Sequence, residues 1–221
     1  MFRKCLLLSL VIALIFSLSS CSPKEVIFPD PNLEAAIREA LDKPDGASLS
    51  LNELGGLNSL NAANRRIVDL TGLEYCTNLT DLQLCWNRFS DISPLASLTN
   101  LTKLHLCGNN ISDIRLLAYL TNLTELTIED ASICDISPLA SLTNLTRLNL
   151  KLNVIGDISP LASLTNLTEL CLCGNQISDI SPLVLLATNL TDLRIARNRL
   201  SDKSVGIYIP QIKESGVEVS Y

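Results

Sequence analysis

The sequence is short of the side chains on which most catalysis and nucleic-acid binding depend. Its 221 residues include one His, one Trp and nine aromatic residues in all, and 23 Asp+Glu outweigh 17 Lys+Arg to give a net charge of -6. An acidic, aromatic-poor chain lacks the basic patches that neutralise phosphates and the rings that stack on bases, so we expect no nucleic-acid partner. A single His also removes most His-dependent chemistry.

Catalytic motifs are missing as well. The sequence contains no P-loop, no GxSxG and no HExxH, so it indicates neither a phosphate cradle, nor an activated serine, nor a zinc-protease helix. The apolar fraction of 47% is ample for a buried core. We therefore expect a binding or structural protein rather than an enzyme, with no cofactor.

The N-terminal segment has the pattern of an export signal. Two basic residues precede an apolar run over residues 5–18, which is short for a bilayer span. The following Leu-Ser-Ser-Cys resembles the lipobox of bacterial lipoproteins, which implies cleavage before Cys21 and lipid attachment to that residue. We expect a signal peptide over residues 1–20, a lipid-anchored tether over 21–25, and an exported protein on a membrane of the cell envelope, facing outward or the periplasm. The alternative is ordinary signal cleavage with an incidental cysteine.

The rest of the chain is built from an internal repeat. Segments such as LTNLTKLHLCGNNISDI and LTNLTELCLCGNQISDI recur every 22 residues. With a degenerate first copy, about seven copies extend over residues 57–200. One extra residue enters near Ala187, and we expect it on a surface turn. The matching leucines are Leu82, Leu104, Leu126, Leu148, Leu170 and, one residue late, Leu193.

Each copy predicts one turn of a solenoid. In LxxLxLxxN the alternate leucines have the two-residue period of a strand, so they point inward and the residues between them point outward. The Asn turns the chain inward, where its amide can satisfy open backbone groups. The following Asp-Ile-Ser-Pro-Leu predicts a short turn, with Pro at its start. The expected fold is α/β, a right-handed leucine-rich repeat solenoid with a parallel concave sheet and short 3₁₀ or helical convex turns.

Arg65 stands in place of the Asn in the degenerate first copy, and two further copies depart from this pattern. The fourth has Ala131 in place of the Asn, and we expect a looser turn there. The third has Arg115-Leu116-Leu117 in place of Ser-Pro-Leu, and we expect its outer segment to be more fully helical. These are the copies in which the regular stack is expected to change.

The repeats resemble those of the internalin family, with copies that contain DISPLASLTN. The resemblance covers residues 57–200. Residues 26–56 look like the family's helical N-terminal cap, in which Asp30 caps a helix opened by Pro31. We expect residues 201–221 to form a C-terminal helix and a closing strand. No immunoglobulin-like domain or sortase motif follows in this sequence, unlike many internalins, which agrees with an N-terminal anchor.

The outward strand positions form three columns on the concave face, where we expect binding. We expect a monomer that recognises a protein or glycan. The first column largely alternates in sign, so a solvated face stabilised by its own charge pairs is the alternative. Trp86, at a site that holds Gly108 and Gly174 in other copies, is the best single hot-spot candidate. The expected binding residues are Asp81, Gln83, Trp86, Lys103, His105, Glu125, Glu129, Arg147, Lys151, Glu169 and Arg194.

Cysteines leave a further hypothesis open. Cys85 and Cys107 are neighbours in the third column and Cys171 and Cys173 share one strand, in a spacing that does not match a disulfide scaffold. Cys85, Cys107 and His105 could coordinate zinc with water as the fourth ligand. A thiol or zinc site is therefore one alternative function, and a purely structural role in the envelope is another.

Overall fold

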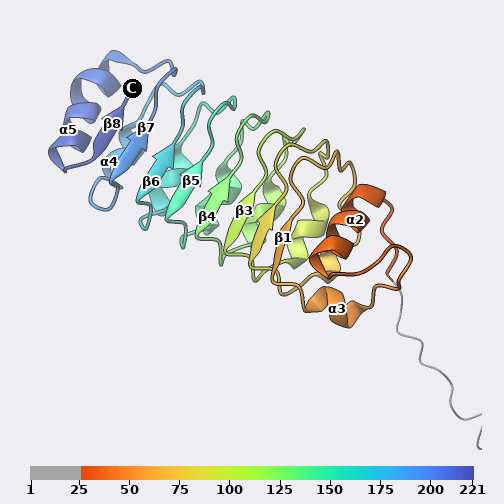
Figure 1. Cartoon of the computed structure of the whole chain (residues 1–221). Helices are drawn as coiled ribbons and strands as arrows, with labels where there is room; N and C mark the ends of the chain where they lie inside the picture. The colour runs from red at the N-terminus through yellow and green to blue at the C-terminus, as the bar shows by residue number, and fades with distance from the viewer. Residues whose placement is uncertain (1–25) are drawn as a thin grey trace, which may run out of the picture.

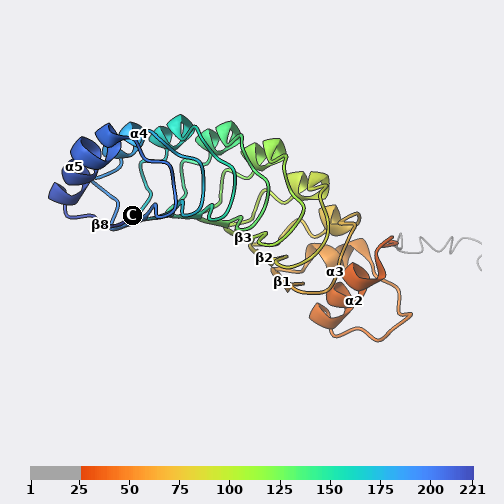
Figure 2. The same cartoon turned by 90° about the horizontal axis from the view of Figure 1, so that it is seen from above.

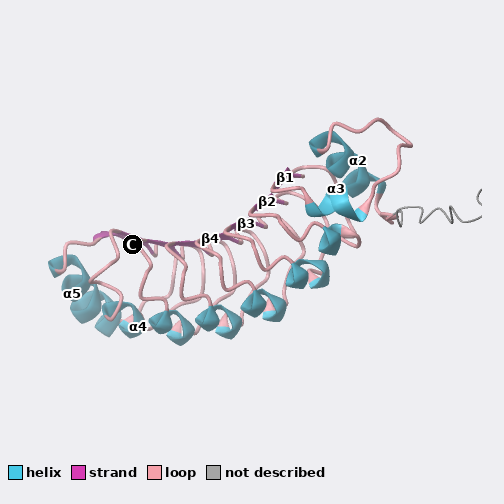
Figure 3. Cartoon of the chain, turned by 90° about the horizontal axis from the view of Figure 1, so that it is seen from below, coloured by secondary structure: helices cyan, strands magenta, loops and turns pink. Residues whose placement is uncertain are grey.

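The computed structural model describes residues 26–221, which form a curved rod of stacked turns (Figure 1). The expected signal peptide, tether and lipidation of Cys21 lie outside the described residues. Eight short strands pair in sequence order. They line the concave side of the rod, and helical turns line the convex side (Figures 2 and 3). The strands are β1 Ser59–Asn61, β2 Asp81–Gln83, β3 Lys103–His105, β4 Glu125–Thr127, β5 Arg147–Asn149, β6 Glu169–Cys171, β7 Asp192–Arg194 and β8 Glu218–Ser220.

The register of the parallel sheet follows the repeat. Leu82 in β2 lies opposite Leu60 in β1 and Leu104 in β3, and the outward positions align in the same way. These leucines are at most 1% exposed. No copy can bury its apolar side alone, so each stabilises its neighbours through one continuous core.

The convex side consists of short 3₁₀ turns, as expected. In η2, Asp91 accepts hydrogen bonds from the amide (2.8 Å) and the hydroxyl (2.9 Å) of Ser93. It thus fixes the entry to the turn without acting as its N-cap, which is Ile92. The 3₁₀ turns are η1 Leu73–Tyr75, η2 Ser93–Ser97, η3 Arg115–Tyr119, η4 Ser137–Ser141 and η5 Ser159–Ser163.

Two expectations about the outer turns were wrong. The third copy is no more helical than its neighbours, since η3 is a five-residue 3₁₀ turn like η4. Its buried Leu117 and Leu120 occupy the same core positions as in other copies, and these anchors decide its shape. The extra residue of the sixth copy falls beside a short α-helix, α4 Ser181–Val184, and Ala187 is buried rather than on the surface.

Two helices, α2 Pro31–Ala40 and α3 Leu51–Gly55, close the N-terminal end. The buried carboxylate of Asp30 accepts amide hydrogen bonds from the first turn of α2 through one oxygen, which confirms it as the N-cap. Its other oxygen accepts from the amides of Val68 (2.7 Å) and Asp69 (3.2 Å). One side chain therefore joins the cap to the first repeat.

At the other end, the π-helical turn η6 Ser204–Tyr208 leads into α5 Ile209–Glu214, and the chain returns in β8 beside β7. Ser204 is fully buried, and its hydroxyl donates to the carbonyl of Ser178 (2.7 Å). The last repeat is thus covered on the convex side and paired on the concave side. Over residues 26–221, no helix is both long and apolar enough to cross a bilayer.

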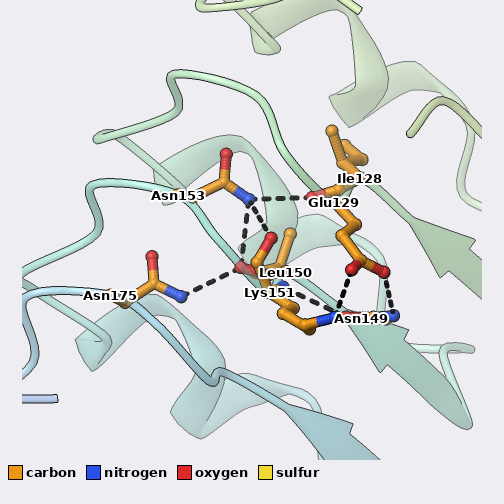
Figure 4. Close-up of polar contacts among 7 residues, drawn as sticks. All are labelled: Ile128, Glu129, Asn149, Leu150, Lys151, Asn153 and Asn175. Carbon is orange, nitrogen blue, oxygen red and sulfur yellow. Dashed lines mark hydrogen bonds and ion pairs between the residues drawn. The ribbon is translucent and has the colours of Figure 1, made fainter. Parts of the chain in front are cut away.

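A ladder of buried asparagines holds successive turns together (Figure 4). Asn153 donates to the carbonyl of Leu150 in its own copy (3.0 Å) and to that of Ile128 in the copy before (2.8 Å), and it accepts from the amide of Ile133 (3.2 Å). Asn175 repeats the pattern, and its bond to the copy before goes to the carbonyl of Leu150 (2.9 Å), which therefore accepts from both asparagines. Each Asn therefore satisfies backbone groups of two copies at the inward turn.

The recurring Asn-Leu-Thr segment forms a second ladder. Asn144 donates to the carbonyl of Thr121 (2.9 Å), and Thr146 donates through its hydroxyl to the carbonyl of Thr124 (3.0 Å). The same bonds recur in neighbouring copies, for example from Asn166 to Thr143 (2.8 Å). These side chains have a structural task in the stack, which accounts for their periodic recurrence.

The fourth copy breaks the first ladder without changing the shape of the turn. Asp130 has φ +54°, close to the +56° of Leu152 in the next copy, so the backbone is not rearranged. Ala131 has no side-chain amide. Among the described residues, the backbone N–H of Ile111 therefore finds no hydrogen-bond acceptor. The departure from the pattern is therefore a loss of bonds.

We predict that Ala131→Asn stabilises the protein by about 1 kcal/mol, because the new amide can donate to carbonyls of the third and fourth copies and accept from Ile111. Chemical denaturation followed by circular dichroism measures this change.

The matched control is Asn153→Ala, which removes an intact rung and leaves the carbonyl of Ile128 and the amide of Ile133 unpaired. We expect this variant to lose about 3 kcal/mol, since each unpaired buried group costs about 1–3 kcal/mol. Equal stability of wild type, Ala131→Asn and Asn153→Ala would show that the ladder does not hold the stack together.

Candidate binding face

The strands line the concave face (Figure 3), and their register aligns the outward positions in three columns. In the first column, Glu125 forms an ion pair with Arg147 of the next strand, and its other oxygen lies 3.6 Å from Nε2 of His105. Lys103 and Glu169 make no ion pair with any residue from 26 to 221. The charges at the centre of the first column, on Glu125 and Arg147, therefore neutralise each other, whereas Lys103 and Glu169 on either side keep single charges.

In the second and third columns the main contact is between neighbouring strands. Nζ of Lys151 lies 2.5 Å from Oε1 of Glu129, and the amide of Asn149 donates to the same carboxylate (3.4 Å; Figure 4). Glu129 raises the pKa of Lys151 through this hydrogen bond. Toward the C-terminal end, Arg194 pairs with Asp192 of its own strand (2.5 Å).

An open depression lies over β4 to β7, where these columns meet. It is polar and carries both signs of charge, so it suits a ligand with complementary charges of its own better than a polyanion. Gln83 and Asp81 lie outside it, toward the N-terminal end of the face. The side chains around the depression include Glu125, Arg147, Asn149, Glu169, Cys171, Asp192 and Arg194.

Trp86 lies at one edge of the concave face, and its conformation is unusual. Its backbone has φ +60°, in the left-handed region that favours Gly, and its side chain is 57% exposed. The ring covers Gly108 of the next copy, where an added Cβ would be 2.2 Å from Cε3 of the indole. One face of the indole therefore packs on backbone and the other is free.

From the sequence we did not predict that the residue at the position of Trp86 has a positive φ in every copy. Every copy has positive φ at this position, whether the residue is Gly, Asn, Asp or larger. Where the residue is bulky, the next copy has Gly, since Leu152 lies over Gly174 as Trp86 lies over Gly108. The signal was present in the sequence as two large-to-Gly pairs, each 22 residues apart.

The cysteines and His105 do not form the zinc site considered from the sequence. His105 turns toward Glu125, and among residues 26–221 no three His, Cys, Asp or Glu side chains are grouped to hold a metal ion. Cys107 is 9% exposed, less than an outward position suggests, and its amide donates to Sγ of Cys85 (3.3 Å). The six cysteines in this part of the chain are free thiols.

Comparison with known proteins identifies relatives with the same repeat architecture. Residues 99–141 and 143–185 match a sequence family described as leucine-rich repeats in two copies. Internalin C2 from Listeria monocytogenes str. 4b F2365 is 36% identical, with a TM-score of 0.70 over 90% of this chain and 96% of that one. The chain belongs to the internalin family. Internalin F of the same strain is 32% identical, with a TM-score of 0.67 over 87% of this chain and 68% of that one.

Among curated proteins, Internalin C of Listeria monocytogenes serotype 1/2a (strain EGD / Mackaness) is 36% identical over 69 residues. That segment is 31% of this chain and 23% of Internalin C, so the match spans about a quarter of that relative. The internalin-type repeat inferred from the sequence is confirmed, and this internalin-like fold supports a protein-interaction module.

We predict that Gly108→Ala destabilises the protein by at least about 2 kcal/mol, since a methyl group adds a clash with Trp86 to the strain of a positive φ. Denaturant titration measures the loss, and the emission of the single Trp reports displacement of the ring.

Gly216→Ala is the matched control, because Gly216 has φ +91° and nothing within 4 Å of its added Cβ. It should lose only about 1 kcal/mol from backbone strain. In a Trp86→Ala background the cost of Gly108→Ala should fall to that of the control. An unchanged cost there would mean that Trp86 does not pack on Gly108.

Proposed function

We propose that this internalin-family chain is an envelope-anchored binding protein that recognises a protein partner through its concave face and the adjoining Trp86. The observation that carries the proposal is the exposed indole, held in a left-handed conformation against Gly108 at the edge of a charged face. Keeping a large side chain in that conformation costs about 1–2 kcal/mol. A contact between the exposed indole and a partner protein would compensate for this cost.

The charges of the face support a protein as the partner. Glu125 and Glu129 are each neutralised by a cation of the next strand, while Lys103 and Glu169 stay available. A surface with isolated charges of both signs around an aromatic edge matches the composition of protein interfaces, in which an aromatic anchor is surrounded by polar contacts. Arg147, with its side chain 48% exposed, can reach a partner while it pairs with Glu125.

To test this, cells producing the full chain are treated with a crosslinker, and partners are compared between wild type, Trp86→Ala and Arg147→Glu. We expect both variants to lose at least tenfold of the crosslinked partner, as removal of a hot spot costs at least about 2 kcal/mol. Mass spectrometry identifies the partner.

Tyr119→Ala is the control, because Tyr119 is exposed to 63% on the convex turn η3. The proposal fails if the partner is lost equally in this variant or retained in Trp86→Ala. A folded wild type that captures nothing would favour the purely structural role, and capture abolished by glycan removal alone would favour a glycan ligand.

We further propose that lipid on Cys21 anchors the protein. The five residues from Cys21 to Glu25 span at most about 18 Å, so the N-terminal cap would lie close to the bilayer and the concave face would meet partners in or near the same envelope. Replacing Cys21 with Ala should shift the protein from the detergent phase to the aqueous phase in a detergent partition experiment. Wild-type protein found in the aqueous phase would contradict anchoring.

A further inference from the structure

Two thiols face each other at the edge of the concave sheet, and neither has a part in the proposed partner binding. Cys85 follows β2 and Cys107 follows β3, and the backbone ladder continues past both strands. The amide of Leu84 donates to the carbonyl of His105 (2.9 Å), and that of Trp86 donates to the carbonyl of Cys107 (2.7 Å). Cys85 and Cys107 are therefore directly opposite.

Their spacing suits a covalent bridge. Neighbouring strands lie about 4.8 Å apart, and disulfides form across Cα separations of about 4.4–6.8 Å. Both residues directly follow strands that line the inner, concave side of the curved rod (Figure 2). The amide of Cys107 donates to Sγ of Cys85 (3.3 Å), so that sulfur already leans toward the neighbouring strand.

The pair is also chemically activated. The Cys85 thiol donates a hydrogen bond to Cys107, which lowers the pKa of Cys107 to about 7, although burial and the charge of the Glu129 carboxylate oppose the shift. The same bond raises the pKa of Cys85, which keeps its proton. The hydrogen bond thus favours a thiolate at Cys107 beside a protonated Cys85, and the thiolate is the nucleophile in disulfide exchange.

We propose that Cys85 and Cys107 form a reversible disulfide between adjacent copies, with a small-molecule disulfide as the oxidant. The Cys107 thiolate attacks one sulfur of the oxidant, which forms a mixed disulfide and releases one thiolate. Cys85 then gives up its proton to solvent and attacks Sγ of Cys107, which forms the intramolecular bond and releases the second thiolate. Two electrons pass from the cysteines to the oxidant.

The other cysteines are placed less well for this reaction. Cys171 ends β6 and Cys173 lies two residues further along the chain, about 6.6 Å away along an extended backbone, near the upper limit for a bridge. Burial raises the pKa of Cys171 to about 11 and that of Cys76 to about 12. Cys134 is exposed with no neighbouring thiol in the described chain. The reaction is therefore specific to one pair.

Oxidation would act on the edge that carries Trp86. Cys85 directly precedes Trp86, and Cys107 directly precedes Gly108, on which the indole lies. A bond between the two cysteines ties these neighbouring turns together beneath the ring. The site is thus a modification site at the edge of the proposed binding face, whether or not that face binds a protein.

The test treats the full chain at neutral pH with bis(2-hydroxyethyl) disulfide, blocks remaining thiols and maps tryptic peptides by mass spectrometry without reduction. Cleavage after Arg and Lys places Cys85 in the peptide of residues 67–88 and Cys107 in that of residues 104–115. We expect these two peptides to be linked, and dithiothreitol to separate them. Fragmentation of the linked species should place the bond at Cys85 rather than Cys76.

Cys85→Ser and Cys107→Ser should each abolish the linked species, and the double variant Cys171→Ser/Cys173→Ser should leave its yield unchanged. The proposal is overturned if wild type gives only mixed disulfides or unmodified thiols, or if the link persists in Cys85→Ser. Because no partner is present in the experiment, its outcome is independent of the crosslinking result.

Discussion

The structure depends on the hydrogen bonds that each buried asparagine makes at the inward turn. Backbone groups there point away from the sheet ladder, and leaving one of them buried and unpaired costs about 1–3 kcal/mol. Asn153 bonds to its own copy and to the copy before, so it fixes both the turn and the offset between turns. Leucines supply the burial that drives the stack together. The asparagines add hydrogen bonds that tie each copy to the one before in the 22-residue register.

The 22-residue register determines which residues are in contact across neighbouring copies. Residues 22 apart become neighbours on the same face, which brings Glu125 to Arg147 and Glu129 to Lys151. The same offset places the ring of Trp86 on Gly108. The candidate binding face, the covered glycine and the thiol pair are therefore all consequences of one structural constraint, and each copy can vary its outward residues without disturbing the core.

Much of this could be predicted from the sequence because the repeat is explicit. The strand positions, the columns and the role of Asp30 follow from periodicity and capping chemistry. The direction of His105 could not be predicted, since a half-buried imidazole is free to choose among several polar neighbours. The shape of η3 was misjudged because its local sequence was weighed above its buried Leu117 and Leu120, which the core holds in place.

Backbone amide exchange, measured residue by residue, tests the central claim most directly. The amides of Ile67, Ile133 and Ile155 donate to an asparagine oxygen of the next copy, whereas that of Ile111 finds no such acceptor among the described residues. Exchange at Ile133 and Ile155 should therefore be markedly slower than at Ile111, although all four side chains are equally buried. Equal protection at these positions would show that leucine burial alone sets the register.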